Sequence, residues 1–397
     1  MNTVARIEAA VAALGEGPLT EDNVARHVAP LFSRVRDAWR DRIYLANHSL
    51  GRPLDATEED VREGLAAWYA RMGGAWDAWS GEMRAYRTRL ADLMGAARFD
   101  CVVPKTSAGQ GLRAILNTYD QVARVVATRG EFDSLDVILR EYARRGRIAL
   151  TLVEPDEVVA ALNAPVDLVV VSHVMFNTGR CVPGLADIVA RAHRAGGRVL
   201  LDVYHSLGVL PVDVDALDVD FAVGGSYKYL RGGPGACYLY VAPRHLDGRL
   251  RTLDIGWFAK REPFAYRRPD PPVLAEGGDA FLESTPAVLP LYQARAGQVF
   301  TRAVGVPRLR AWSLDRQARL LDAVAARGIE AVGATADRGA FLTVVNDAAE
   351  GWADALGAAG VVTDARGTYL RLCPDLLTTD AEMTAAAAAL AATRPRS

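Results

Sequence analysis

This sequence predicts an α/β fold, with a large domain built on a mostly parallel sheet sandwiched by helices and a smaller α+β domain after it. Between about residues 98 and 245, short apolar runs alternate with segments of helical periodicity, which indicates crossover units in a parallel sheet. After about residue 250 the chain becomes Pro-rich and then mixed in pattern. Its 397 residues, 50% of them hydrophobic, can bury a sizeable core.

The elements are expected in a simple order. Residues 1–42 and about 57–95 carry apolar residues at helical spacing, and Thr57 followed by Asp60 is typical of a capping box. Helices are expected again around 289–328. We therefore divide the chain into an N-terminal helical segment that packs with the small domain (1–42), a large domain (43–258) and a smaller C-terminal domain (259–397). The strands expected in the large domain are 101–103, 122–127, 148–153, 166–172, 197–202, 220–223 and 237–241.

Composition narrows the function classes. The chain has 46 basic and 48 acidic residues, and this balance argues against a nucleic-acid partner, which requires a basic face. No signal-peptide pattern and no apolar run of about 18 residues is visible, so we expect no membrane segment. The four cysteines are scattered and the six histidines show no zinc spacing, which favours a cytoplasmic protein with reduced thiols and no metal.

Two polar groups follow apolar strands where ligands bind in open α/β sheets. Asp202 ends the run 197–202, and His205 follows it closely, so both are expected at the carboxyl edge of the sheet. Taken alone, Asp202 could cap a helix and His205 could be a core histidine. Lys228 lies between the apolar run 220–223 and a Gly/Pro-rich loop. A lysine in such a position is either a surface lysine or a desolvated one whose pKa is lowered for Schiff-base chemistry.

A lysine, a carboxylate and an anion cradle together are what pyridoxal 5′-phosphate (PLP) requires. The lysine forms a Schiff base with the cofactor, and the carboxylate keeps the pyridine nitrogen protonated. The segment Lys105-Thr-Ser-Ala-Gly-Gln-Gly111 joins an apolar strand to a helical pattern, and hydroxyl and amide groups at a helix N-terminus suit a phosphate. We therefore predict a PLP enzyme with its cofactor on Lys228 and with Asp202 facing the pyridine nitrogen.

Several motifs resemble the kynureninase-like branch of the class V aminotransferase superfamily, whose members have PLP fold type I. Ser226-Tyr-Lys-Tyr-Leu-Arg-Gly-Gly-Pro-Gly235 is similar to the family's lysine motif, and Asp202-Val-Tyr-His-Ser-Leu-Gly208 to its Asp-x-x-His-Ser-x-Gly. Further matches lie at 43–51, 132–134, 172–179 and 256–258. The resemblance implies an amino-acid substrate and a homodimer with shared active sites.

The resemblance also implies a role for each matching residue. Thr106, Ser107 and Tyr227 would bind the phosphate, with Tyr227 also a candidate proton donor. Phe132 would stack on the cofactor ring beside Ser134, and Ser172 and His205 would line the cofactor. Trp257 and Thr285 would serve the neighbouring subunit's site. Arg371 would bind the substrate carboxylate, for which a bidentate guanidinium is suited, although a surface arginine is the alternative.

Three positions depart from the family pattern. His48 replaces an asparagine, Lys260 replaces a histidine and Leu135 replaces an aspartate. Since the cofactor positions fit while these differ, we expect retained PLP chemistry on an altered substrate, with His48 and Lys260 facing the substrate side chain. The favoured hypothesis is a lyase or hydrolase that cleaves at Cβ. The alternatives are an aminotransferase and a catalytically silent binding protein, and the intact Lys228–Asp202 pair argues against the last. A cysteine desulfurase is less favoured, because Cys373 lies within an apolar run after Arg371.

Overall fold

The computed structural model describes residues 2–395. Its helices are α1 (Thr3–Ala12), α2 (Glu21–Asn23), α3 (Ser33–Ala38), α4 (Ala56–Arg71), α5 (Ala75–Met94), α6 (Ala108–Leu116), α7 (Asp133–Arg144), α8 (Val158–Ala161), α9 (Leu185–Arg194), α10 (Val288–Val304), α11 (Val306–Ala325), α12 (Ala349–Ala358) and α13 (Asp380–Thr393). The strands are β1 (Ile43–Tyr44), β2 (Val102–Lys105), β3 (Ala123–Thr128), β4 (Ile148–Val153), β5 (Leu168–Ser172), β6 (Arg198–Asp202), β7 (Phe221–Gly225), β8 (Cys237–Val241), β9 (Leu342–Val345), β10 (Val361–Val362), β11 (Asp364–Arg366) and β12 (Tyr369–Leu372).

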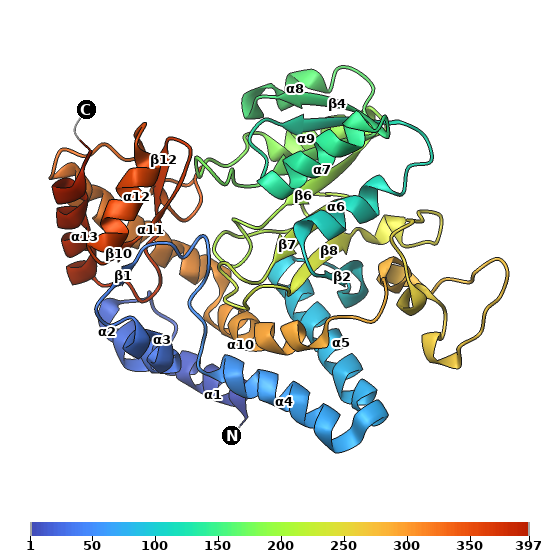
Figure 1. The fold of residues 1–397 in the computed structure, drawn as a ribbon, viewed down its shortest axis with the longest axis horizontal. Coiled ribbons are helices and arrows are strands. Elements are labelled where there is room, and N and C mark those ends of the chain that lie inside the picture. Colours follow the sequence, from blue (N-terminus) through green and yellow to red (C-terminus); the bar gives the residue numbers. More distant parts are fainter. Residues whose placement is uncertain (1, 396–397) are drawn as a thin grey trace.

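The centre of the molecule is a seven-stranded sheet in the order β2-β8-β7-β6-β5-β3-β4 (Figure 1). Neighbouring strands from β7 to β4 are parallel, while β8 runs antiparallel to both β2 and β7. Strands β2, β7, β6, β5 and β3 therefore point the same way, and their carboxyl ends share one edge. All seven expected strands form, within a few residues of their expected ends.

Helices cover both faces of this sheet, because successive strand residues face opposite sides. On one face α6 and α7 pack against residues such as Val125, Val170 and Leu200. On the other face α5 and α9 pack against the alternate residues, among them Val169 and Leu201. Strand β5 is buried along its whole length, which explains why its sequence is apolar without alternation.

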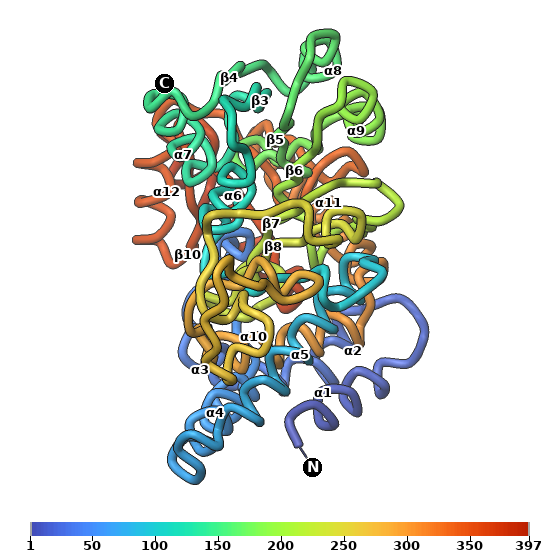
Figure 2. Tube along the Cα trace, turned by 90° about the vertical axis from the view of Figure 1, so that its right-hand side faces the viewer, coloured from blue at the N-terminus to red at the C-terminus, as the bar shows by residue number. Residues whose placement is uncertain are grey.

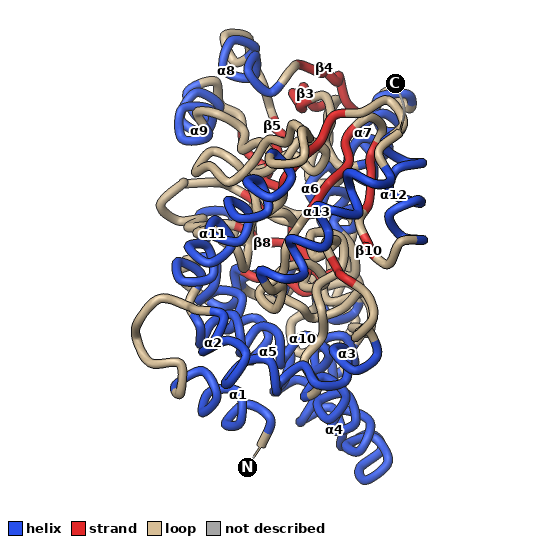
Figure 3. Tube along the Cα trace, turned by 90° about the vertical axis from the view of Figure 1, so that its left-hand side faces the viewer, coloured by secondary structure: helices blue, strands red, loops and turns tan. Residues whose placement is uncertain are grey.

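The C-terminal part contains a smaller antiparallel sheet, β11-β12-β9, packed with α11, α12 and α13. These helices lie on the side of the molecule shown in Figure 3. The first residues of the chain reach this part too, since β1 pairs with β10 and the short helix α1 packs on α10. The α/β class with a mixed, mostly parallel sheet and a smaller α+β part is confirmed, while the domain boundaries at 42 and 258 stay predictions.

The expected capping box at Thr57 and Asp60 is wrong. Helix α4 begins at Ala56, two residues before the start that the capping box predicts, and the buried hydroxyl of Thr57 has no hydrogen-bond partner among residues 2–395. Asp60 instead accepts a hydrogen bond from Thr3 (2.6 Å) and pairs with Arg295 of α10 (3.1 Å). A charged partner from a distant helix outweighs the local amide that the capping pattern assumes. The tip of the α4–α5 hairpin projects from the body of the protein (Figure 2).

Candidate active site

Lys228 lies in the turn after β7, at the carboxyl edge of the large sheet. Its side chain is buried, with Nζ 2.5 Å from Nε2 of His205 and 5.5 Å from the ring centroid of Phe132. Burial lowers the pKa of Lys228, and the negative charge of Asp202 opposes that shift only in part. A lysine amine with a lowered pKa is neutral for a larger share of the time and can act as a nucleophile near neutral pH.

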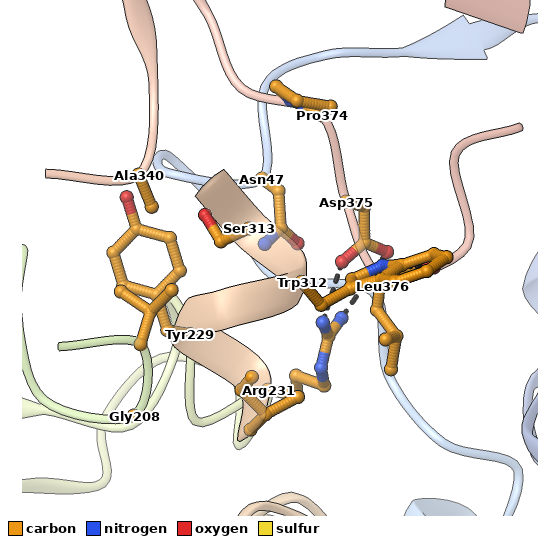
Figure 4. Close-up of a pocket in the computed structure, with 12 residues that line it drawn as sticks. Asn47, Gly208, Tyr229, Arg231, Trp312, Ser313, Ala340, Pro374, Asp375 and Leu376 are labelled. Carbon is orange, nitrogen blue, oxygen red and sulfur yellow. Dashed lines mark hydrogen bonds and ion pairs between the residues drawn. The ribbon is translucent and has the colours of Figure 1, made fainter. Parts of the chain in front are cut away.

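The turn that carries Lys228 is held by its neighbours. Gly51 donates its N–H to the carbonyl of Tyr227 (2.8 Å), and any side chain at Gly51 would collide with the carbonyl of Lys228. Arg231 forms a buried ion pair with Asp375 (2.6 Å) beside a small cavity lined by Asn47 and Tyr229 (Figure 4). These contacts fix the backbone on both sides of Lys228.

Asp202 ends β6, directly opposite Ser172 of β5 in the sheet register. Its Oδ1 accepts the N–H of Tyr204 (2.8 Å), and among residues 2–395 no side chain or amide donates to Oδ2. Burial raises the pKa of Asp202, while the hydrogen bond from Tyr204 and the charge of Lys228 act in the opposite sense. A buried carboxylate with one open oxygen is suited to a charged N–H donor, such as a protonated pyridine nitrogen.

Thr106 and Ser107 lie between β2 and α6 at the same edge of the sheet. The hydroxyl of Ser107 caps α6 by accepting the N–H of Gln110 (3.1 Å), and the side chain of Gln110 accepts from the N–H of Thr106 (2.7 Å). The first N–H groups of a helix have no acceptor within it and carry partial positive charge. This turn therefore offers amide and hydroxyl donors to a phosphate.

Aromatic rings surround the lysine. The rings of Tyr204 and Tyr227 each lie 5.8 Å from Nζ of Lys228, and Phe132 packs edge-on against Phe176. Burial raises the pKa of Tyr227 to about 12, so its phenol keeps its proton at neutral pH. The structure thus brings together Lys228, Asp202, His205, Phe132 and Tyr227, with Thr106, Ser107 and Ser172 on the same edge of the sheet.

A buried glutamate that the sequence patterns did not single out supports this group. Glu131 accepts the N–H and the hydroxyl of Ser172 (3.0 and 2.6 Å) and also the hydroxyl of Thr128. Burial raises the pKa of Glu131 to about 7, and its hydrogen bonds counteract part of that shift. Since Glu131 directly precedes Phe132, it anchors the turn that presents this ring. Its only sequence signal was an acidic residue three positions after the end of β3.

The expected substrate-side residues lie in different places. Arg371 on β12 and His48 are both buried and both bond to Asp364 of β11, which sequence reasoning missed. Lys260 instead donates to the carbonyl of Arg267 (3.0 Å), within the loop that follows the large sheet. Leu135 belongs to the first turn of α7 and is fully buried in the core.

Trp257 and Thr285 lie together. The indole N–H of Trp257 donates to the hydroxyl of Thr285 (3.1 Å), and the indole ring packs on Phe258 and Tyr266. Ser134 is exposed on the first turn of α7. None of these three side chains forms a hydrogen bond to the lysine group in the described part of the chain.

Residues 55–348 match the family model described as aminotransferase class-V. The chain belongs to this family. It is 31% identical over 301 residues to the kynureninase of Deinococcus radiodurans, covering 72% of each chain. It is 29% identical over 237 residues to the kynureninase of Pseudomonas fluorescens, covering 56% of each. The predicted resemblance to kynureninases is thereby confirmed as a distant one.

Solved structures show the same fold. A variant of C-DES with glycine covalently linked to its PLP cofactor has a TM-score of 0.80 at 19% identity, covering 91% of this chain and 98% of that one. The cysteine desulfurase CsdA of Escherichia coli has a TM-score of 0.74 at 18% identity, with 91% and 98% covered. PLP fold type I is confirmed, and the cofactor of this chain is PLP.

The residues described above fit that cofactor. Lys228 would supply the amine, Asp202 the open carboxylate oxygen, Phe132 a ring face, and the start of α6 the phosphate donors.

Among residues 2–395, no helix is long and apolar enough to cross a membrane.

Proposed function

We propose that this protein is a PLP-dependent lyase or hydrolase of the kynureninase type, which cleaves an amino acid at Cβ next to an electron-withdrawing γ-substituent. The observation that carries the proposal is the position of Tyr227, whose ring centroid lies 5.8 Å from Nζ of Lys228, on a chain whose relatives include kynureninases. PLP, when bound, draws electrons away from the bonds at the substrate's α-carbon. Cleavage at Cβ additionally requires a proton donor near the side chain.

Two residues divide the proton transfers. Lys228, with its lowered pKa, accepts and returns the proton at the α-carbon. Tyr227 remains protonated at neutral pH because burial raises its pKa to about 12, and its hydroxyl has no hydrogen-bond partner among residues 2–395. A free, protonated phenol beside the lysine is suited to deliver a proton to the carbon or oxygen from which the bond is broken.

A desulfurase mechanism is less well supported. It requires a mobile cysteine thiolate, whereas Cys373 is buried and donates its thiol to the carbonyl of Ala340 (3.0 Å). Burial raises the pKa of Cys373 and of Cys181 alike, and a raised pKa keeps a thiol unreactive. The likeness to desulfurase structures therefore concerns the fold.

We also propose a homodimer. Among residues 2–395, neither Trp257 nor Thr285 forms a hydrogen bond to the Lys228 group of its own chain, and they bond to each other instead, as expected for residues that serve a neighbouring subunit. Several large apolar side chains are exposed, including those at the α4–α5 tip and beside Trp257: Trp68, Tyr69, Met72, Phe264 and Tyr266. Exposed apolar groups of this size are typical of an interface, and most oligomers are symmetric dimers.

Product analysis tests the reaction type against the alternative, a class V aminotransferase. Catalytic amounts of enzyme are incubated with L-kynurenine and other amino acids that carry a γ-carbonyl, without a keto acid. We expect sustained release of alanine or another shortened amino acid over many turnovers. A single half-turnover that leaves pyridoxamine phosphate, and resumes only when a keto acid is added, would establish a transaminase instead. Tyr227→Phe is expected to slow cleavage while α-proton exchange in D2O continues.

A further inference from the structure

Arg371 is locked onto a carboxylate of its own chain. Its Nε and Nη2 donate to Oδ1 and Oδ2 of Asp364 at 2.9 and 2.6 Å, a bidentate pair. The two residues lie directly opposite each other on the antiparallel strands β12 and β11, so the sheet register fixes their contact. The guanidinium side chain is only 2% exposed.

Asp364 is itself held from a third part of the chain. Nε2 of His48 lies 2.7 Å from Oδ1, and the hydroxyl of Ser49 donates to Oδ2 at 2.5 Å. Burial raises the pKa of Asp364, but the hydrogen bond from His48 and the charge of Arg371 outweigh it and keep the pKa well below its usual range. Each carboxylate oxygen thus accepts two hydrogen bonds, and Asp364 joins the segment 48–49 to Arg371.

This arrangement uses three of the N–H groups of the guanidinium. The Nε/Nη2 edge is used by Asp364, and Nη1 donates one hydrogen to the carbonyl of Phe176 (2.5 Å). An arginine side chain has five N–H groups in a fixed plane. Among residues 2–395, one N–H group on Nη1 and one on Nη2 therefore have no acceptor, and two such groups can bind a second carboxylate through the Nη1/Nη2 end.

We infer that Asp364 is a positioning residue which, together with His48 and Ser49, orients Arg371 so that its Nη1/Nη2 end binds the α-carboxylate of the substrate. The opposite role, in which Asp364 competes with the substrate carboxylate, would require a ligand to displace an oxygen pair that accepts four hydrogen bonds. The inference rests on the amino-acid chemistry proposed above but not on which bond is cleaved. An enzyme that failed the product analysis could still pass the test below. An enzyme that passed the product analysis could likewise fail it.

The test compares two ligands that differ only in the carboxylate, L-alanine and ethylamine. Their dissociation constants are measured on the cofactor-loaded enzyme by calorimetry and by cofactor absorbance, and the rate of α-proton exchange of L-alanine in D2O is followed by NMR. In Asp364→Ala, which frees the guanidinium plane, we expect L-alanine to bind about tenfold or more weakly. Ethylamine binding and the exchange rate at saturating L-alanine should stay within about threefold.

Graded variants and a control keep the test sharp. Asp364→Asn retains one acceptor oxygen and should lie between wild type and Asp364→Ala. If Asp364→Ala does not fold, Ser49→Ala is the substitute, because it removes one hydrogen-bond donor from Asp364 and leaves the contacts of Arg371 in place. It should weaken the binding of L-alanine by a few fold. Asp218→Asn removes a carboxylate that pairs with Arg244 far from the site and should change nothing. Tighter or unchanged L-alanine binding, or equal weakening of both ligands, would overturn the inference.

Discussion

Replacing Asp202 by asparagine separates the cost of its buried charge from its use in catalysis. The side chain keeps its size and its Oδ1, which accepts the N–H of Tyr204 at 2.8 Å. What is lost is the negative charge at Oδ2, the oxygen that we propose faces the pyridine nitrogen. A hydrogen bond to a charged group is worth about 1.5–3 kcal/mol, so we expect turnover to fall about 10- to 150-fold.

The stability of the cofactor-free protein should not fall with turnover in Asp202→Asn. Burial raises the pKa of Asp202 above its unfolded value, so the ionised carboxyl group destabilises the cofactor-free fold as the pH rises through that range. The variant lacks this penalty. Its cofactor-free form should be at least as stable as wild type at pH 8, and the difference should shrink at pH 5.

Two measurements decide the outcome. Turnover is measured with saturating PLP, and urea unfolding of the cofactor-free protein is measured at pH 5 and pH 8, with Asp218→Asn as the surface control. Near wild-type turnover in Asp202→Asn would refute the assignment to the pyridine nitrogen. A marked loss of cofactor-free stability would show that the side chain supports the fold through its charge.

Three further predictions follow from the same geometry. Borohydride reduction of the yellow, cofactor-loaded enzyme should fix PLP to the peptide that contains Lys228, and labelling of another lysine would exclude the assignment. Burial raises the pKa of Glu131 from 4.5 to about 7, so wild-type stability should decrease between these pH values by up to about 3 kcal/mol from this group. Urea unfolding of Glu131→Gln at pH 5 and 8 should lack that decrease, and an unchanged pH dependence would contradict the interpretation. Light scattering should find a dimer. Mixing inactive Lys228→Ala and Trp257→Ala subunits should restore about a quarter of wild-type activity, because half of the dimers would be mixed and each mixed dimer would hold one complete site of two. No recovery of activity would count against a shared site.

Local patterns along the chain were sufficient for the large domain. Buried strands of a parallel sheet are continuous apolar runs, and the polar residue that ends such a run lies at the carboxyl edge of the sheet. For that reason the sequence could place Asp202, Ser172 and the Lys228 turn at this edge. Taken alone, Lys228 could also have been a surface lysine. The cofactor followed from that lysine, the carboxylate and the motifs around them.

The substrate side could not be predicted in the same way. Asp364 lies on the short strand β11, which pairs with β12. Nothing in its local sequence indicates that its carboxylate pairs with Arg371 and bonds to His48 and Ser49. Asp60 shows the same limit, because its pairing with Arg295 cancelled a capping pattern that is locally plausible.

By itself, then, the sequence determined the fold class, the cofactor and the residues at the carboxyl edge of the sheet, because those depend on strand periodicity and on motifs read along the chain. The tertiary structure alone decided which carboxylate each buried arginine pairs with and which side chains hold the residues at the carboxyl edge of the sheet, as Glu131 holds Ser172. The physical reason is that a buried charge must find a partner wherever the fold provides one, and the partners of Arg371 and Arg295 lie in segments that only folding brings together.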